Sequence, residues 1–158
     1  MRGPGLAALV LLLSSSATGC SLLVKECTLI GCSDGLALEV SARGSPLPPG
    51  VYKFHFALDG AIQELECAVQ VEPRASRCDS LGGARGGALG GAVYDAAGKT
   101  SKFQLRLAPA KTISMLLASS NGLRVERTFG PTYREFEPNG PGCAPTCVEA
   151  SASIEVDP

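Results

Sequence analysis

The sequence contains no tryptophan, a single histidine and no long apolar run among its 158 residues. A helix needs about 20 apolar residues to cross a bilayer, and the run at residues 6–13 is far shorter. The chain is therefore not expected to contain a transmembrane helix. Its 14 basic residues are scattered among 15 acidic ones and form no basic stripe of the kind that binds nucleic acid. No nucleic acid is expected as a partner.

The lone histidine, His55, limits the catalytic machinery that the chain can hold. A Ser-His-Asp arrangement would have to use it, but no serine stands in a Gly-x-Ser-x-Gly setting. The glycine-rich residues 81–91 lack the Lys-Ser/Thr ending of a phosphate-binding loop. No run of alternating Asp and Asn residues indicates a calcium loop. The sequence therefore predicts no enzyme and no cofactor, with His55 as an ordinary surface residue.

Two pairs of glutamates are the remaining catalytic candidates. Glu64 and Glu66 share one face of a predicted strand, and Glu135 and Glu137 share another. Paired carboxylates can hydrolyse glycosidic bonds, so a small secreted hydrolase or a carbohydrate-binding accessory domain is the alternative function. Alternating acids on a solvated strand face are the commoner reason for this pattern. Convergence of the two pairs on one cleft would reverse the preference.

The first twenty residues have the three parts of a secretory signal peptide. Arg2 gives a positive start, residues 6–13 an apolar run, and residues 14–19 small side chains that end at Cys20.

The tetrapeptide Ala17-Thr18-Gly19-Cys20 resembles the lipobox of bacterial lipoproteins. The resemblance implies cleavage before the cysteine, whose sulfur would carry a diacylglycerol and whose new amine would be acylated. Ala17 departs from the family, in which leucine is most frequent at this position. Ordinary cleavage after Gly19, with Cys20 left as a thiol, is the alternative.

Seven cysteines favour lipidation, because an odd number in a secreted protein leaves one thiol over. Assigning Cys20 to lipid leaves six cysteines for three disulfides. Two or more acyl chains hold a protein firmly on a membrane, whereas one binds only marginally. Ser21 is not an aspartate, and by the sorting rule of enteric relatives this implies delivery to the outer membrane of a Gram-negative bacterium.

Alternation of apolar and polar residues predicts strands along most of the remaining chain. Asp59-Gly60 and Asn121-Gly122 are strong signals for tight hairpin turns. The glycine-rich residues 81–91 are expected to form a loop. The expected strands are 36–42, 51–58, 61–71, 103–107, 112–118, 123–129 and 148–156, with a short strand at 92–94 as a possible eighth and a short run at 133–137. This number and spacing predict an all-β, immunoglobulin-like β-sandwich of seven to eight strands, stapled by disulfides.

The disulfides follow from this fold. Cys67 and Cys78 flank the end of the first hairpin and are expected to pair. In a sandwich the first and last strands often lie side by side and parallel, which would bring the cysteines before each strand to the same end. We therefore favour Cys32 with Cys147 and Cys27 with Cys143, while local bridges between 27 and 32 or between 143 and 147 stay open.

A zinc site made of Cys27, Cys32, Cys143 and Cys147 is a further alternative to these bridges. Their spacing lacks the tight pairs of zinc ribbons, and the secretory route favours oxidation. No metal site is therefore expected.

A second resemblance covers most of the mature chain. The segment LPPGVYKF at residues 47–54, the Asp-Gly turn, Cys67 and the segment PNGPGCAPTC at residues 138–147 look like small secreted lipoproteins of uncharacterised myxobacterial type. The family has no assigned activity. The resemblance supports the fold and the location, and it implies no mechanism.

The sequence thus predicts a lipoprotein signal peptide (1–19), an anchor with a short disulfide-bearing segment (20–35) and a β-sandwich domain (36–158). We expect a non-enzymatic lipoprotein of the cell envelope, displayed on the membrane through Cys20 with a binding or structural role. An envelope protein or a glycan is the candidate partner.

Overall fold

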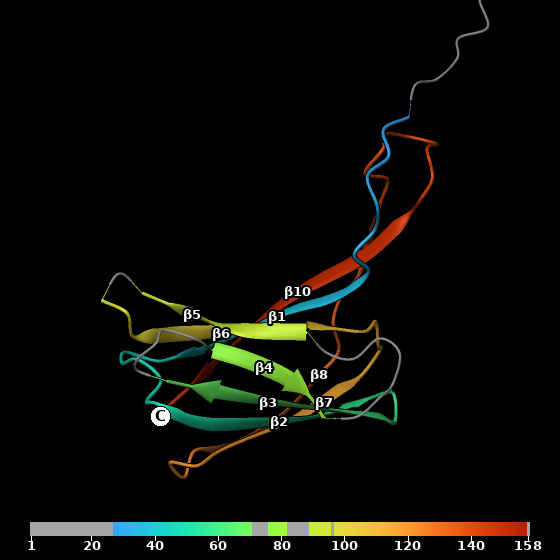
Figure 1. Cartoon of the computed structure of the whole chain (residues 1–158). Helices are drawn as coiled ribbons and strands as arrows, with labels where there is room; N and C mark the ends of the chain where they lie inside the picture. The colour runs from blue at the N-terminus through green and yellow to red at the C-terminus, as the bar shows by residue number, and fades with distance from the viewer. Residues whose placement is uncertain (1–26, 71–75, 82–88, 96, 158) are drawn as a thin grey trace, which may run out of the picture.

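The computed structural model describes residues 27–70, 76–81, 89–95 and 97–157, which form a sandwich of two five-stranded β-sheets (Figure 1). The fold is all-β, as predicted, but the described residues form ten strands rather than seven or eight. None of them forms a helix of the length and apolarity that crossing a membrane requires. The predicted signal peptide and Cys20 lie outside the described residues.

The first sheet has the strand order β5-β6-β1-β10-β9 and contains the first and last strands of the chain. Its members are β5 (Leu89–Tyr94), β6 (Thr100–Leu107), β1 (Gly35–Ala42), β10 (Cys147–Val156) and β9 (Arg134–Phe136). Strands β1 and β10 are parallel neighbours, with Leu36 opposite Ala150, as the disulfide prediction requires.

The second sheet has the order β4-β3-β2-β7-β8 and is antiparallel throughout. Its members are β4 (Ser76–Ser80), β3 (Ala61–Val69), β2 (Gly50–Leu58), β7 (Ile113–Ser119) and β8 (Arg124–Phe129). The β2–β3 hairpin turns at Asp59 and Gly60, whose φ angles are 49° and 92°. Both residues have the positive φ that a tight hairpin turn of this twist demands.

The core lies between the two sheets and consists of the inward-facing residues of the alternating strands. Tyr52, Phe54 and Phe56 on β2 and Phe103 on β6 are buried, and Phe54 meets Phe103 edge to face, with a distance of 5.2 Å between the ring centres. The Tyr52 hydroxyl donates a 2.6 Å hydrogen bond to the carbonyl of Pro48, which fixes the chain where it enters β2. The alternation read from the sequence therefore assigns this strand's core face correctly.

Two strands differ from the sequence prediction. Strand β4 occupies residues 76–80, where the sequence predicts no strand. Strand β5 includes the predicted 92–94 but begins at Leu89, inside the glycine-rich residues 81–91 that were expected to form a loop. Strand β4 lies against β3 with Cys67 directly opposite Cys78. Gly90 pairs with Leu105, and a Cβ atom there would lie 2.4 Å from a Leu105 methyl carbon, so the glycine allows the close approach of β5.

Candidate functional site: a braced arm and a hollow on one sheet

A narrow arm projects from one end of the sandwich and carries four of the six disulfide cysteines. We define the arm as residues 27–34, which precede β1, and residues 137–147, which end at the start of β10. The two segments run side by side away from the sandwich, and the C-terminal end of β10 lies at the opposite end (Figure 1). The arm therefore contains the first described residues after the predicted lipid attachment site.

Two disulfides join the segments of the arm. Cys27 is bonded to Cys143 and Cys32 to Cys147, with Cα–Cα distances of 5.8 and 5.3 Å. These are the pairs that the sequence favours, and the local bridges do not form. The parallel pairing of β1 with β10 explains them, because it places the residues before both strands at one end of the sheet.

Asn139 joins the same segments by hydrogen bonds. Its carboxamide oxygen accepts bonds from the Thr28 hydroxyl (2.7 Å) and the Ile30 amide (2.8 Å). Its carboxamide nitrogen donates to the carbonyls of Ile30 (3.1 Å) and Ala144 (2.7 Å). Asn139 is 7% exposed, so a buried amide holds four partners across the arm. Sequence reasoning missed this residue, because Asn139 in PNGPG has the composition of an ordinary turn.

The third disulfide lies in the second sheet, away from the arm. Cys67 on β3 and Cys78 on β4 are directly opposite each other, with a Cα–Cα distance of 4.1 Å. The bridge is the expected one, but it joins two paired strands and does not close a plain loop.

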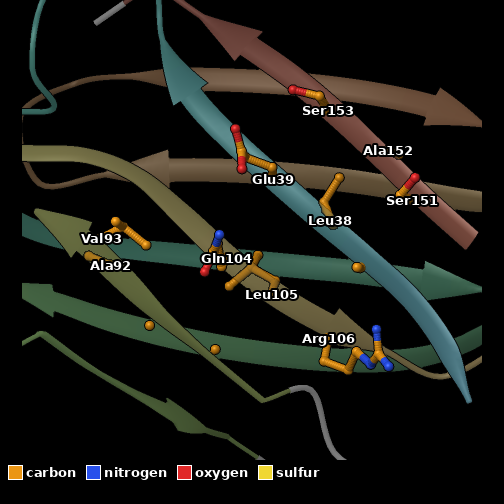
Figure 2. Close-up of a pocket in the computed structure, with 13 residues that line it drawn as sticks. Leu38, Glu39, Ala92, Val93, Gln104, Leu105, Arg106, Ser151, Ala152 and Ser153 are labelled. Atoms are coloured by element: carbon orange, nitrogen blue, oxygen red, sulfur yellow. The ribbon is translucent and has the colours of Figure 1, made fainter. Parts of the chain in front are cut away.

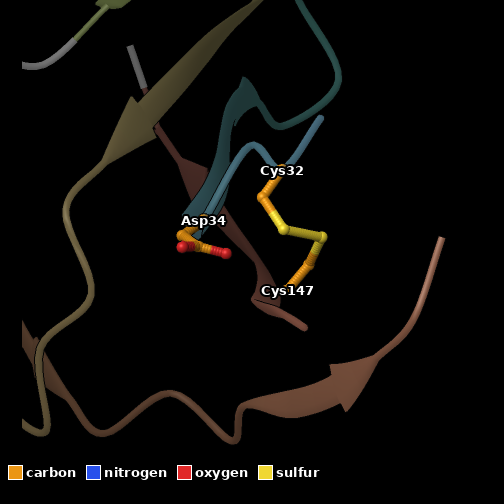
Figure 3. Close-up of side chains that lie close together, drawn as sticks. All are labelled: Cys32, Asp34 and Cys147. Atoms are coloured by element: carbon orange, nitrogen blue, oxygen red, sulfur yellow. A yellow bond between two sulfur atoms is a disulfide. The ribbon is translucent and has the colours of Figure 1, made fainter. Parts of the chain in front are cut away.

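The structure argues against the four-cysteine zinc site, because all four cysteines are in disulfides. The Sγ atoms of Cys32 and Cys147 and a carboxylate oxygen of Asp34 lie within 4.8 Å of one another (Figure 3). The two sulfurs are bonded to each other, whereas the thiolate is the form of cysteine that binds metals. The Asp34 carboxylate accepts a hydrogen bond from the Val148 amide at 2.8 Å. The cluster therefore joins the arm to β10.

A hollow of about 840 Å³ lies on the outer face of the first sheet, across β5, β6, β1 and β10 (Figure 2). Its outward residues form two rows across the strands. Arg106, Ala37 and Ser151 are aligned in one row, and Gly91, Gln104, Glu39 and Ser153 in the other. Glycine, alanine and serine leave space where larger side chains would fill the face, and this produces the hollow.

The charges in the hollow are largely matched within the protein. Lys102 Nζ lies 2.6 Å from Glu39 Oε2, so this carboxylate already has a cation. The Arg106 guanidinium donates to the carbonyl of Ser33 and thereby connects the hollow to the arm. The lining thus offers hydroxyl, amide, carboxylate and guanidinium groups, but no cysteine or histidine. Such a surface can bind a ligand by hydrogen bonds and contains no activated nucleophile of the kind that covalent catalysis uses.

The two candidate pairs of glutamates lie in different parts of the fold. Glu64 and Glu66 lie on β3 in the second sheet, whereas Glu135 lies on β9 in the first sheet and Glu137 follows it in the arm. Glu64 contacts His55 at 2.9 Å, which makes the histidine part of an exposed surface pair.

Glu66 and Glu137 each have a different partner. Lys53 lies 3.2 Å from Glu66 on the outer face of β2 and β3. The Glu137 carboxylate accepts a hydrogen bond from the Gly142 amide within the arm. Four hollows on the described part of the chain, including the one on the first sheet, are lined by none of the four candidate glutamates.

Two described groups with clearly shifted pKa values lie away from the hollow. Burial raises the pKa of the Tyr52 hydroxyl, and a hydrogen bond with Asn121 partly opposes this effect. The pKa of Asp59 is lowered because its carboxylate accepts hydrogen bonds from the amides of Lys111 and Thr112, at 2.9 and 2.8 Å. Both groups stabilise turns at the ends of β2.

A scan of protein-family models, a search of curated proteins and a search of solved structures each found no match to the chain. The roles of the arm and the hollow therefore rest on their own chemistry.

Proposed function

We propose that the chain is a non-enzymatic lipoprotein of the bacterial cell envelope, anchored through Cys20 and displaying its sandwich for binding. The observation that carries this proposal is the braced arm. Two disulfides fasten the first described residues to the start of β10. The anchor would thus be joined to the sandwich through a braced arm that begins seven residues after it.

The chain length between anchor and arm supports this arrangement. Cys27 follows Cys20 by seven residues, which span at most about 25 Å when fully extended. Three disulfides in a domain of this size fit an oxidising compartment such as the periplasm or cell surface. The lipobox resemblance supplies the attachment chemistry, and Ser21 favours the outer membrane of a Gram-negative bacterium.

The hollow supports a binding role over a catalytic one. It presents polar groups on a rigid sheet, which suits a glycan or a segment of an envelope protein. The separation of the two glutamate pairs on different elements argues against the hydrolase alternative.

The test is the intact mass and membrane location of the protein made in a Gram-negative host. The wild type should have the mass of a chain that begins at Cys20 and carries acyl chains. Reduction should add two hydrogens for each of three disulfides. The variant Cys20→Ala should lack the acyl chains and be released by osmotic shock.

The matched control is Ser21→Asp, which should keep the acyl chains but move the protein to the inner membrane. An unacylated wild type with one alkylatable thiol would contradict the proposal.

A further inference from the structure

Two adjacent aliphatic side chains are exposed on the arm. Five large hydrophobic residues are exposed among the described residues: Leu29 and Ile30 lie in the arm and Phe136 at its base on β9, whereas Ile62 on β3 and Leu81 after β4 are single exposed residues of the second sheet. Leu29 is 101% exposed and Ile30 is 53% exposed. Exposure of two adjacent aliphatic side chains to water is unfavourable. The question is therefore what covers them.

The conformation of this segment is fixed by the arm itself. Thr28 and Ile30 are both hydrogen-bonded to the buried Asn139, and Leu29 lies between them. The disulfides of Cys27 and Cys32 hold the segment at both ends. Leu29 is therefore exposed by a defined structure.

The length of the preceding chain limits what can cover these side chains. Leu29 follows Cys20 by nine residues, a distance of at most about 30 Å when fully extended. If Cys20 carries the lipid, the bilayer surface lies within this reach. Strand β10 leads from the arm to the far end of the sandwich, so the arm is the end that faces the anchor.

We propose that Leu29 and Ile30 insert into the lipid surface beside the Cys20 anchor and fix the orientation of the sandwich on the membrane. This inference rests on the proposed lipid anchor. The arm contains Asp34 and Glu137 but no lysine or arginine, so the contact is apolar and not electrostatic. It should therefore persist at high salt and be weaker on anionic lipid than on zwitterionic lipid.

The absence of tryptophan makes a direct test simple, because one substitution creates a single-tryptophan protein. The lipidated full-length variant Leu29→Trp is reconstituted into phosphatidylcholine vesicles, with and without bromine atoms on the acyl chains. Bromine quenches indole emission on contact. Ser45→Trp is the matched control, since Ser45 is also exposed and follows the end of β1 that points away from the arm.

The indole at position 29 should emit at shorter wavelength in vesicles, and brominated lipid should reduce its emission about two-fold or more, as expected for a group at the acyl boundary. The indole at position 45 should show neither change. The full exposure of Leu29 means that the substitution disturbs no packing, and intact mass verifies three disulfides in each variant.

An acylated, vesicle-bound Leu29→Trp protein whose emission is unshifted and unquenched would overturn this inference and leave the lipid anchor standing. A protein without acyl chains in the mass spectrum would overturn the anchor, and the inference with it.

Discussion

The two disulfides of the arm close nearly the same loop, and this overlap predicts that they stabilise the fold non-additively. Cys27 and Cys143 are 116 residues apart, and Cys32 and Cys147 are 115 apart. Alone, either bridge restricts the unfolded chain across a loop of this length. The loop-entropy relation gives about 5 kcal/mol for such a closure at 25 °C.

The second bridge adds much less once the first is present. Cys27 lies five positions before Cys32 and Cys143 four before Cys147. The second bridge therefore closes a ring of only about nine residues, which is worth about 2.5 kcal/mol. Removing one bridge should cost about 2.5 kcal/mol, and removing both should cost about 7.5 kcal/mol. The coupling, about 2.5 kcal/mol beyond the sum of the single removals, is the quantity to measure.

Urea denaturation of three variants measures this coupling. They are Cys27→Ala with Cys143→Ala, Cys32→Ala with Cys147→Ala, and the fourfold combination. Alanine is preferred to serine because Cys143 and Cys147 are buried. If the fourfold variant is unfolded in buffer, the same cycle is measured in an osmolyte that favours the folded state.

Removal of the third bridge provides the control. Cys67 and Cys78 are eleven residues apart in the other sheet, and alanine at both should cost about 3 kcal/mol. This cost should add to that of either arm pair without coupling. If the costs of removing the two arm bridges were strictly additive, the overlapping-loop argument would be refuted. Each bridge would then act through native contacts.

Two further changes test the turns that flank β2. Asp59→Asn should destabilise the protein at about pH 6, and the difference from wild type should disappear as the pH falls below the lowered pKa of Asp59. The Lys111 and Thr112 amides lower the pKa of Asp59 below 3.8, so its contribution is present at higher pH and is lost as the pH falls through the lowered pKa. Urea titrations across this pH range measure both effects, and a pH-independent difference would contradict the assignment. Tyr52→Phe should lower the free energy of unfolding by about 1–2 kcal/mol, because the Pro48 carbonyl loses its buried donor. An unchanged denaturation midpoint for this variant would show that water replaces the hydroxyl.

The sequence was sufficient for those elements whose signals are local. The β2–β3 hairpin follows from an Asp-Gly turn between two alternating segments, and the structure has it at the expected residues. The arm disulfides needed one non-local assumption, the parallel pairing of the first and last strands. That pairing exists, with Leu36 opposite Ala150.

Strand β4 and the first half of β5 could not be read from the sequence, because their structure depends on partners. The residues Ser-Arg-Cys-Asp-Ser of β4 have no apolar alternation. Their pairing with β3 places Cys78 opposite Cys67, where the disulfide holds the edge strand in place. The β5 segment begins with Leu-Gly-Gly, which is a loop signal by composition. It pairs with β6 because Gly90 tolerates the close approach of Leu105.

The hollow left no trace in the sequence because its lining comes from four strands that are distant along the chain. Ala37, Gly91 and Ser151 are unremarkable one by one, and only the strand order brings them onto one face. Predicting the hollow would have required knowing that β1 lies between β6 and β10. A single alternating segment contains no information on that order.

The arm must be held together by bonds and not by a core. Only Asn139, Cys143 and Cys147 are buried within it, so apolar burial contributes little to its stability. Small structures of this kind depend on disulfides, and the arm has two within a few residues. The Asn139 carboxamide donates to and accepts from Ile30 as a paired backbone peptide would, and it thereby satisfies a segment that has no strand partner of its own. Rigidity built this way uses no apolar side chains, so Leu29 and Ile30 stay exposed on the arm.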